Sequence, residues 1–379
     1  MLSLTKIEMH SGVEPVALAL SQLGEPFLQT DLTNHNNLQF FGKVFIGTPP
    51  QEFTAIFDTG SDAIWVPGQA CTSAACKDHH LFDHNASSTA SLSPEGDGMS
   101  YGTGTVKLQP ALETVRICGK AGCAENELVS HGRPIGLATH KSDRPFAKLP
   151  FDGIAGFPPS SSKGGILDDF FKSQPSSHPR VMSVYLSNDT SIPGSVALGG
   201  VEPHHIAGSD VHWHTLTSPG HQWALKMEDI AIDGQRMHVC PQGGCDALVD
   251  TGSSLITGPT RLMSKVLTQL GTQCEDPSLM KKIEIILKDS DGKEVIYPLD
   301  GKDYSLKFKD GCQVGLGNLD MGDDQWIIGD TFLRRYYSIF DDAHGQIGFT
   351  KAQHDDESIG VVARGIFPVI LPKRYSDFF

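Results

Sequence analysis

The stretch TAIFDTGSDAIWVPG, residues 54–68, places one carboxylate, Asp58, between an apolar run and a Thr-Gly-Ser turn. Aspartate and glycine are common turn residues, so a turn alone could explain this stretch. Residues 247–259, ALVDTGSSLITGP, repeat the arrangement around Asp250. The same local pattern therefore occurs once in each half of the chain, which indicates two related halves.

A glycine-bearing strand is the second part of this repeat. The segment FDGIAGF contains Gly156, 98 residues after Asp58, and WIIGDTF contains Gly329, 79 residues after Asp250. Because glycine lacks a Cβ, a strand that carries it can pass close behind another loop. Two such halves related by a pseudo-two-fold axis would bring the two carboxylates together.

Length and composition limit the class of protein. A chain of 379 residues suggests two lobes of roughly 150 to 200 residues. The residues are 39% apolar and 20% charged, as in soluble globular proteins. No apolar run is long enough to span a membrane, and the net charge of −15 argues against a nucleic-acid partner.

Short β-rich segments separated by Gly, Pro, Asn or Asp dominate the chain, which has 40 glycines and 23 prolines. The segments 164–174 and 259–271 are the best helix candidates, the latter with Pro near its start and Gly at its end. We therefore expect a mostly β fold with few helices and a boundary between lobes near residues 199–209.

The eight cysteines predict disulfides and hence an oxidising compartment. Three pairs are five positions apart and the remaining two cysteines form a long-range pair: Cys71 and Cys76, Cys118 and Cys123, Cys240 and Cys245, and Cys274 and Cys312. Zinc is the alternative, but it usually takes Cys-x-x-Cys spacing. Glycosylation sequons at Asn85 and Asn188 fit a secretory route. Residues 1–26 lack the pattern of a secretory leader, so the sequence begins downstream of one or its start is misassigned.

The order of the motifs resembles that of pepsin-like aspartic proteases from about Leu38 to Ala352. The segments that carry the resemblance are FFGKVFIGTPPQEF, FDTGSDAIWVP, YGTG, PFDGIAGF, VDTGSSLITGP and WIIGDTFLRRYYSIFD. The resemblance implies a bilobal, mostly β fold: two related six-stranded-type β lobes with a few short helices and an active-site cleft between them. Three of the four cysteine pairs match usual bridges of the family, and Cys118–Cys123 is an addition.

The resemblance also implies a division of the chain. Residues 1–37 form an N-terminal extension that could be a pro-segment, with Lys6 in a basic stretch that pairs with the carboxylates. Residues 38–203 form the N-terminal lobe, 204–352 the C-terminal lobe, and 353–379 a tail. Residues 136–157 further resemble plasmepsin-like proteases of apicomplexan parasites.

Family members supply the expected roles of the site residues. Asp58 and Asp250 are the catalytic pair, with Asp250 the expected base and Asp58 the expected acid. The turn residues that position them are Thr59, Gly60, Ser61, Thr251, Gly252 and Ser253. The flap and substrate-binding residues are Tyr101, Gly102, Thr103, Trp65, Ile56, Phe146 and Ile154. Trp65 could instead be a core residue, and for Phe146 and Ile154 the sequence alone favours core packing over substrate contact.

Two adjacent carboxylates cannot both ionise cheaply, so they share a proton and can activate a water molecule for peptide hydrolysis. We expect an aspartic endopeptidase that cleaves between bulky apolar residues, binds pepstatin-type inhibitors, needs no cofactor or metal, acts as a monomer and works in the secretory pathway, outside the cell or in an acidic organelle. The histidine-rich segment 77–84 lacks a Glu-x-x-His pattern and is not expected to bind metal. The alternative is a non-catalytic pepsin-fold binding protein.

Overall fold

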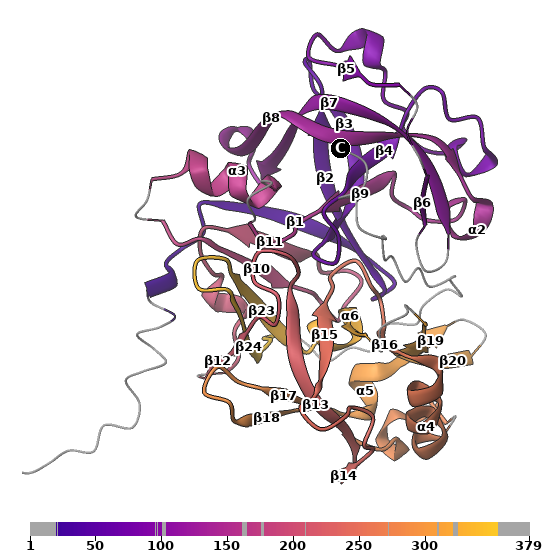
Figure 1. The fold of residues 1–379 in the computed structure, drawn as a ribbon, viewed down its shortest axis with the longest axis vertical. Helices are drawn as coiled ribbons and strands as arrows, with labels where there is room; N and C mark the ends of the chain where they lie inside the picture. Colours follow the sequence, from indigo (N-terminus) through magenta and orange to yellow (C-terminus); the bar gives the residue numbers. More distant parts are fainter. Residues whose placement is uncertain are drawn as a thin grey trace, which may run out of the picture.

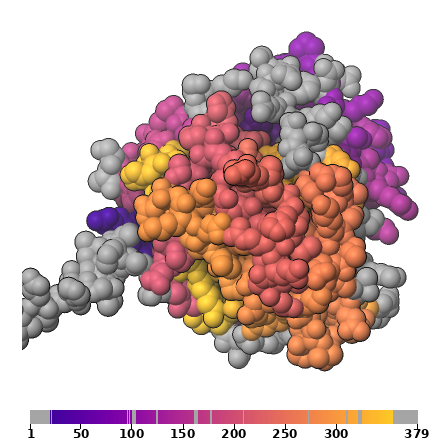
Figure 2. Space-filling model, turned by 60° about the horizontal axis from the view of Figure 1, so that its bottom comes forward, coloured from indigo at the N-terminus to yellow at the C-terminus, as the bar shows by residue number. Residues whose placement is uncertain are grey.

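The computed structural model describes residues 20, 22–94, 96, 98–100, 104–160, 165–175, 178–208, 210–271, 273–308, 311–320 and 325–354. The molecule has two lobes, with the N-terminal lobe at the top of Figure 1 and the C-terminal lobe at the bottom. Both lobes are mostly β, as the sequence predicts. Figure 2 views the molecule from the C-terminal lobe, whose salmon and orange residues form the near face.

The described part of the N-terminal half consists of the strands β1 to β11 and a few short helices. The strands are β1 Leu28–His35, β2 Gln39–Ile46, β3 Gln51–Asp58, β4 Ile64–Pro67, β5 Ser91–Leu92, β6 Gly98–Ser100, β7 Thr105–Gly119, β8 Gly122–Lys141, β9 Gly153–Gly156, β10 Val181–Tyr185 and β11 Gly194–Leu198. The helices in the described part of this half are η1 Ala74–Cys76, η2 His84–Ala86, α2 Asp143–Phe146 and α3 Ile166–Ser173.

The C-terminal half follows the short helix η3 Pro203–His205. Its strands are β12 His212–Thr215, β13 Ala224–Ile232, β14 Gln235–Arg236, β15 Cys245–Val249, β16 Ile256–Gly258, β17 Ile283–Lys288, β18 Glu294–Leu299, β19 Ser305–Phe308, β20 Gly311–Val314, β21 Leu316–Asn318, β22 Trp326–Ile328, β23 Tyr336–Asp341 and β24 Gln346–Lys351. Its other described helices are α4 Thr260–Leu270, η4 Pro277–Leu279, α5 Gly301–Tyr304 and α6 Asp330–Leu333.

The two halves repeat one strand arrangement. In the first, β3 runs parallel to β9, β4 is antiparallel to β9, and β4 is parallel to β8. In the second, β15 runs parallel to β22, β16 is antiparallel to β22, and β16 is parallel to β21. The first strand of each set ends at or directly before an aspartate, so the repeated sequence motif corresponds to a repeated structure.

A central sheet joins the lobes in the strand order β12-β24-β23-β10-β11-β1. The first three strands come from the C-terminal half and the others from the N-terminal half, so the sheet is shared and belongs to neither lobe alone (Figure 1). β1 lies inside residues 1–37, which the sequence analysis assigned to an extension. Its Leu28 and Leu32 are fully buried, and it pairs with β11 and β2.

The two expected helices are present as α3 and α4. α4 is preceded by Pro259 and ends at Gly271, whose φ of 85° lies in the left-handed region that glycine adopts most easily. Its buried residues Leu262, Met263 and Val266 lie on one side of the helix, as the helical repeat predicts, and pack into the hydrophobic core. In the part of the chain that the structure describes, no helix is long and apolar enough to cross a membrane.

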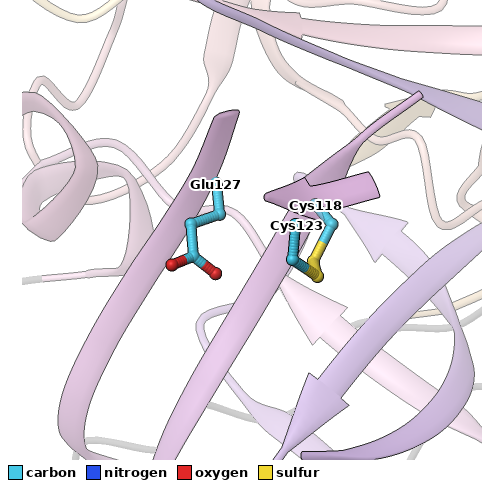
Figure 3. Close-up of side chains that lie close together, drawn as sticks. All are labelled: Cys118, Cys123 and Glu127. Carbon is cyan, nitrogen blue, oxygen red and sulfur yellow. A yellow bond between two sulfur atoms is a disulfide. The ribbon is translucent and has the colours of Figure 1, made fainter. Parts of the chain in front are cut away.

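The four predicted disulfides are formed between the expected partners. Figure 3 shows the additional bridge, Cys118–Cys123, which lies at the end of the β7–β8 hairpin with Glu127 beside it. Glu127 pairs with Arg116 at 3.1 Å on the same hairpin. Because the two sulfurs are bonded to each other, they offer no thiolate to a metal ion.

Candidate active site

Asp58 and Asp250 meet at the junction of the two lobes, and both are fully buried. Asp58 is the last residue of β3, and Asp250 directly follows β15. Their surroundings are nearly identical. Asp58 accepts hydrogen bonds from the Gly60 amide at 2.8 Å and the Ser61 hydroxyl at 2.5 Å. Asp250 accepts them from the Gly252 amide at 2.7 Å and the Ser253 hydroxyl at 2.6 Å. The two carboxyl groups also hydrogen-bond each other.

Thr59 and Thr251 connect the two turns. The Thr59 amide donates to the Thr251 hydroxyl at 3.1 Å, and the Thr251 amide donates to the Thr59 hydroxyl at 3.0 Å. Each hydroxyl in turn donates to the opposite lobe: Thr59 to the Val249 carbonyl at 2.8 Å and Thr251 to the Phe57 carbonyl at 2.5 Å. This reciprocal network fixes the distance and register between the lobes at the carboxylates.

Gly60 and Gly252 allow the close approach of the turns. A Cβ added to Gly60 would lie 2.5 Å from the Asp250 carboxyl carbon, and one added to Gly252 would lie 2.5 Å from Asp58 Oδ1. Both distances are far below van der Waals contact, so any larger residue at either position would push the carboxylates apart.

The glycine-bearing strands lie directly behind the two turns. A Cβ on Gly156 would lie 2.7 Å from the Ser61 carbonyl oxygen, and one on Gly329 would lie 2.2 Å from the Ser253 carbonyl oxygen. The repeated glycines of the sequence therefore let β9 and the end of β22 support the two aspartate turns.

Burial raises the pKa of both aspartates, because it disfavours their charged forms. The nearby charge of Asp250 and the hydrogen bond from its carboxyl group raise the pKa of Asp58 further, well above its ordinary value. The hydrogen bonds from Ser253, Gly252 and Asp58 act in the opposite direction on Asp250. The pair therefore retains a shared proton at pH values where an isolated aspartate would be ionised.

Four of the residues expected in the flap and subsites lie in one buried apolar cluster. Trp65, Ile56, Phe146 and Ile154 are each at most 2% exposed and pack with Met99 of β6 and Val106 of β7. The rings of Trp65 and Phe146 meet edge to face at 5.7 Å. The other three, Tyr101, Gly102 and Thr103, lie outside the described residues.

The sequence analysis missed the role of Asp152, in the segment FDGIAGF. Its carboxylate accepts hydrogen bonds from the Thr54 and His80 amides and contacts the rings of His79 and His80, each at 3.2 Å. Burial alone would raise the pKa of Asp152, but these hydrogen bonds together hold it well below its usual value. The histidine-rich segment thus supplies partners for a buried carboxylate, and only its proximity in space could have indicated this.

Lys141 is a second buried charge in this region. Its Nζ lies 3.5 Å from the Asp152 carbonyl oxygen, and burial lowers its pKa to about 8 despite the nearby Asp152 charge. Asp330, in WIIGDTF, is also buried, and burial raises its pKa well above the ordinary value. Nothing in the sequence pattern distinguishes these residues from surface charges.

A two-lobed β fold that brings two Asp-Thr-Gly-Ser turns together defines the class of aspartic-type endopeptidases. Comparison with known proteins gives the same class. The model of the eukaryotic aspartyl protease family matches residues 39–352. Chymosin of Callithrix jacchus is 33% identical over 335 residues, which cover 85% of this chain and 83% of that protein. Pepsin A of Sus scrofa is 32% identical over 331 residues, covering 84% and 82%. Chymosin of Camelus dromedarius is 31% identical over 383 residues, covering 92% and 95%.

The chain therefore belongs to the eukaryotic aspartyl protease family. It is an aspartic-type endopeptidase, a hydrolase that acts on peptide substrates, and the non-catalytic alternative is not favoured. The four disulfides fit an extracellular or secretory location.

Proposed function

We propose that Asp58 and Asp250 are the catalytic residues of this endopeptidase. The observation that carries the proposal is their mutual hydrogen bond inside two nearly identical sets of donors. A water molecule held between the carboxyl groups would lose a proton to the ionised member as it attacks the scissile carbonyl carbon. The protonated member would donate to the carbonyl oxygen and later to the leaving nitrogen.

Within this pair we assign Asp58 as the protonated member and Asp250 as the initial base. The assignment follows the resemblance to pepsin-like proteases, and the burial, the Asp250 charge and the hydrogen bond with Asp250, which raise the pKa of Asp58, are consistent with it. Because the environments are almost symmetrical, the proton-transfer steps alternate between the two residues as the reaction proceeds.

The substrate class we propose is protein or peptide with bulky apolar residues on either side of the cut. Support comes from the apolar character of the residues expected in the subsites, Trp65, Ile56, Phe146 and Ile154, which cluster with Met99 of β6 and Val106 of β7. Profiling with a peptide library tests this preference: enrichment of Phe, Leu and Met around the cut supports it, and a dominance of charged residues contradicts it.

The proposal also covers activation, oligomeric state and cellular location. The residues that precede the two folded lobes act as a pro-segment, and the enzyme works as a monomer. It acts in the secretory pathway, outside the cell or in an acidic organelle. Asn85, in one of the two sequons, is exposed and accessible for glycosylation. The likeness of residues 136–157 to plasmepsin-like proteases stays a prediction, since the relatives described above are mammalian proteins.

A fluorogenic apolar peptide assayed at mildly acidic pH, with and without pepstatin, tests the catalytic assignment. We expect turnover that pepstatin abolishes, and a loss of about 100-fold or more in kcat for Asp58→Asn and Asp250→Asn. The matched control Asp291→Asn, on an exposed turn, should keep the parent rate. Parent-like turnover by either active-site variant would overturn the assignment.

A further inference from the structure

The connection between the lobes contains a buried carboxylate beside two histidines. Glu202 follows β11 and precedes η3, in the segment Glu-Pro-His-His. In a 3₁₀ helix, side chains three residues apart lie on the same side, which brings Glu202 and His205 together. Glu202 Oε1 and His205 Nε2 are 3.8 Å apart. The ring of His204 lies beside that of His205, with centroids 4.1 Å apart.

One oxygen of Glu202 has no hydrogen-bond partner. Glu202 is only 1% exposed, and its Oε2 accepts a hydrogen bond from the Ser195 hydroxyl at 2.6 Å. Its Oε1 is buried as well but accepts no hydrogen bond. Leaving a buried carboxylate oxygen unpaired is unfavourable by about 1–3 kcal/mol or more, so this atom requires an explanation.

The surrounding contacts hold both Glu202 and His205 in place. The Glu202 amide donates to the Tyr337 hydroxyl of β23 at 2.9 Å. The His205 ring stacks flat on Tyr185 of β10, with ring centroids 3.6 Å apart and planes within 4°. Tyr185 in turn contacts the ring of His354 through its hydroxyl at 3.1 Å. His204, in contrast, is exposed and free to turn.

We propose that Glu202, His204 and His205 form a binding site for a divalent metal ion, with Zn²⁺ the best match. One carboxylate oxygen and two imidazole nitrogens are a donor set that zinc prefers, with solvent in the fourth position. The three donor atoms lie within 4.8 Å of one another. Tetrahedral coordination needs separations of about 3.4 Å. Zinc binding would therefore require the exposed His204 ring to rotate and the 3.8 Å separation between Glu202 Oε1 and His205 Nε2 to shorten slightly.

The charged groups around this site are compatible with a bound cation. Lys120 lies close enough to act on both Glu202 and His205, but it forms an ion pair with Asp31 at 2.8 Å. The positive charge of Lys120 is thus largely balanced by a carboxylate. The buried Oε1 of Glu202, which accepts no hydrogen bond, would gain a partner in a bound metal ion.

The position of the site gives the metal a structural role at the junction of three chain segments. The Gln353 amide, after β24, donates to the His205 carbonyl at 2.8 Å. The Val201 amide donates to the Gly24 carbonyl at 3.1 Å, ahead of β1. β11, β23 and β24 belong to the central sheet that joins the lobes (Figure 1). A metal ion held by η3 would therefore stabilise the region where the residues before β1, the connection after β11 and the residues after β24 meet.

Metal binding by the full-length chain without a histidine tag tests the proposal. The protein is stripped with EDTA, dialysed near neutral pH against Zn²⁺, and analysed by titration calorimetry and elemental analysis. We expect one tightly bound Zn²⁺ per chain and a higher Tm in its presence, because a ligand that binds only the folded state stabilises it. His204→Gln and Glu202→Gln should each weaken binding by about ten-fold or more. The exposed His221→Gln serves as the matched control and should bind as the parent does.

The choice of variants separates metal binding from misfolding. His204 is exposed, and Glu202→Gln can keep the hydrogen bond with Ser195, so both variants should retain the parent Tm in EDTA. Failure to bind stoichiometric Zn²⁺, or parent-like binding by both variants, overturns the proposal. Zinc that binds elsewhere, for example at Asp58 and Asp250, would give parent-like binding by both variants. The outcome does not depend on peptidase activity.

Discussion

The backbone amides of Thr59 and Thr251 each donate a hydrogen bond to the other residue's hydroxyl, at 3.1 and 3.0 Å, across the junction of the two lobes. Two residues 192 positions apart thus form a reciprocal pair directly beside Asp58 and Asp250. The same hydroxyls also donate to carbonyls of the opposite lobe. Each threonine therefore connects the lobes through both its donor and its acceptor functions.

Replacing Thr251 with valine removes this connection while keeping the side-chain shape. The Thr59 amide and the Phe57 carbonyl would both lose a buried partner, so we expect the free energy of unfolding to fall by about 2–4 kcal/mol. The peptidase rate should fall too, because the carboxylates lose their fixed separation. Urea unfolding and kcat measure the two effects. Thr251→Ser keeps the hydroxyl and should lie within about 1 kcal/mol of the parent; equal losses in the Val and Ser variants would contradict this role.

The buried pair of Asp58 and Asp250 should reduce the stability of the folded chain at neutral pH. Because the folded-state pKa of Asp58 is raised, the folded chain binds more protons than the unfolded chain above the ordinary pKa of about 4. Stability therefore falls as pH rises from that value toward the raised pKa, by up to about 1.4 kcal/mol per pH unit. Asp58→Asn cannot ionise, so we expect a higher Tm than the parent near neutral pH and a smaller difference near pH 4.

Thermal unfolding over a pH series measures this effect. The peptidase assay should show that Asp58→Asn is inactive, and the unfolding curves should show that it is more stable than the parent near neutral pH. Asp291→Asn, on an exposed turn, is the control and should track the parent at every pH. A variant less stable than the parent across the whole series would show that the hydrogen bonds to Asp58 outweigh the penalty for ionising it.

Asp152 should show the opposite pH dependence. Its folded-state pKa is lowered, so the unfolded chain binds more protons below the ordinary pKa of about 4. The stability that it contributes is complete above that pH and is lost as pH falls further. We expect Asp152→Asn to lower the free energy of unfolding by about 2 kcal/mol near neutral pH and by less in stronger acid. The control is His80→Gln, because that side chain is 76% exposed and contributes little. An Asp152→Asn loss that is constant with pH would point to lost packing rather than lost charge.

The sequence predicted the parts of this fold that depend on local pattern. The two Asp-Thr-Gly-Ser turns, the glycines behind them and the helix ending at Gly271 each require a particular residue type at a particular position. The shared central sheet was not predicted, because β1, β10 and β23 are distant in sequence and their pairing depends on tertiary contacts. The partners of Asp152 and the burial of Lys141 were missed for the same reason, since polar residues in loops carry no signal of what they will contact.

The position of β1 leads to the last prediction, on where the pro-segment ends. The sequence analysis assigned residues 1–37 to an extension that could be a pro-segment, but β1 forms five backbone pairs with β11 and three with β2. Its Leu28 and Leu32 are 1% and 2% exposed, and burial of two leucines stabilises a fold by about 3–6 kcal/mol. A chain that starts at Glu25 should therefore stay folded and active, whereas one that starts at Asn37 should lose the strand between β11 and β2, and with it its activity. N-terminal sequencing after acid incubation should accordingly find a new terminus before Leu28. Circular dichroism melts and peptidase assays of the two truncated chains provide the comparison, and a stable, active chain that begins at Asn37 would prove β1 dispensable and restore the assignment of residues 28–35 to the pro-segment.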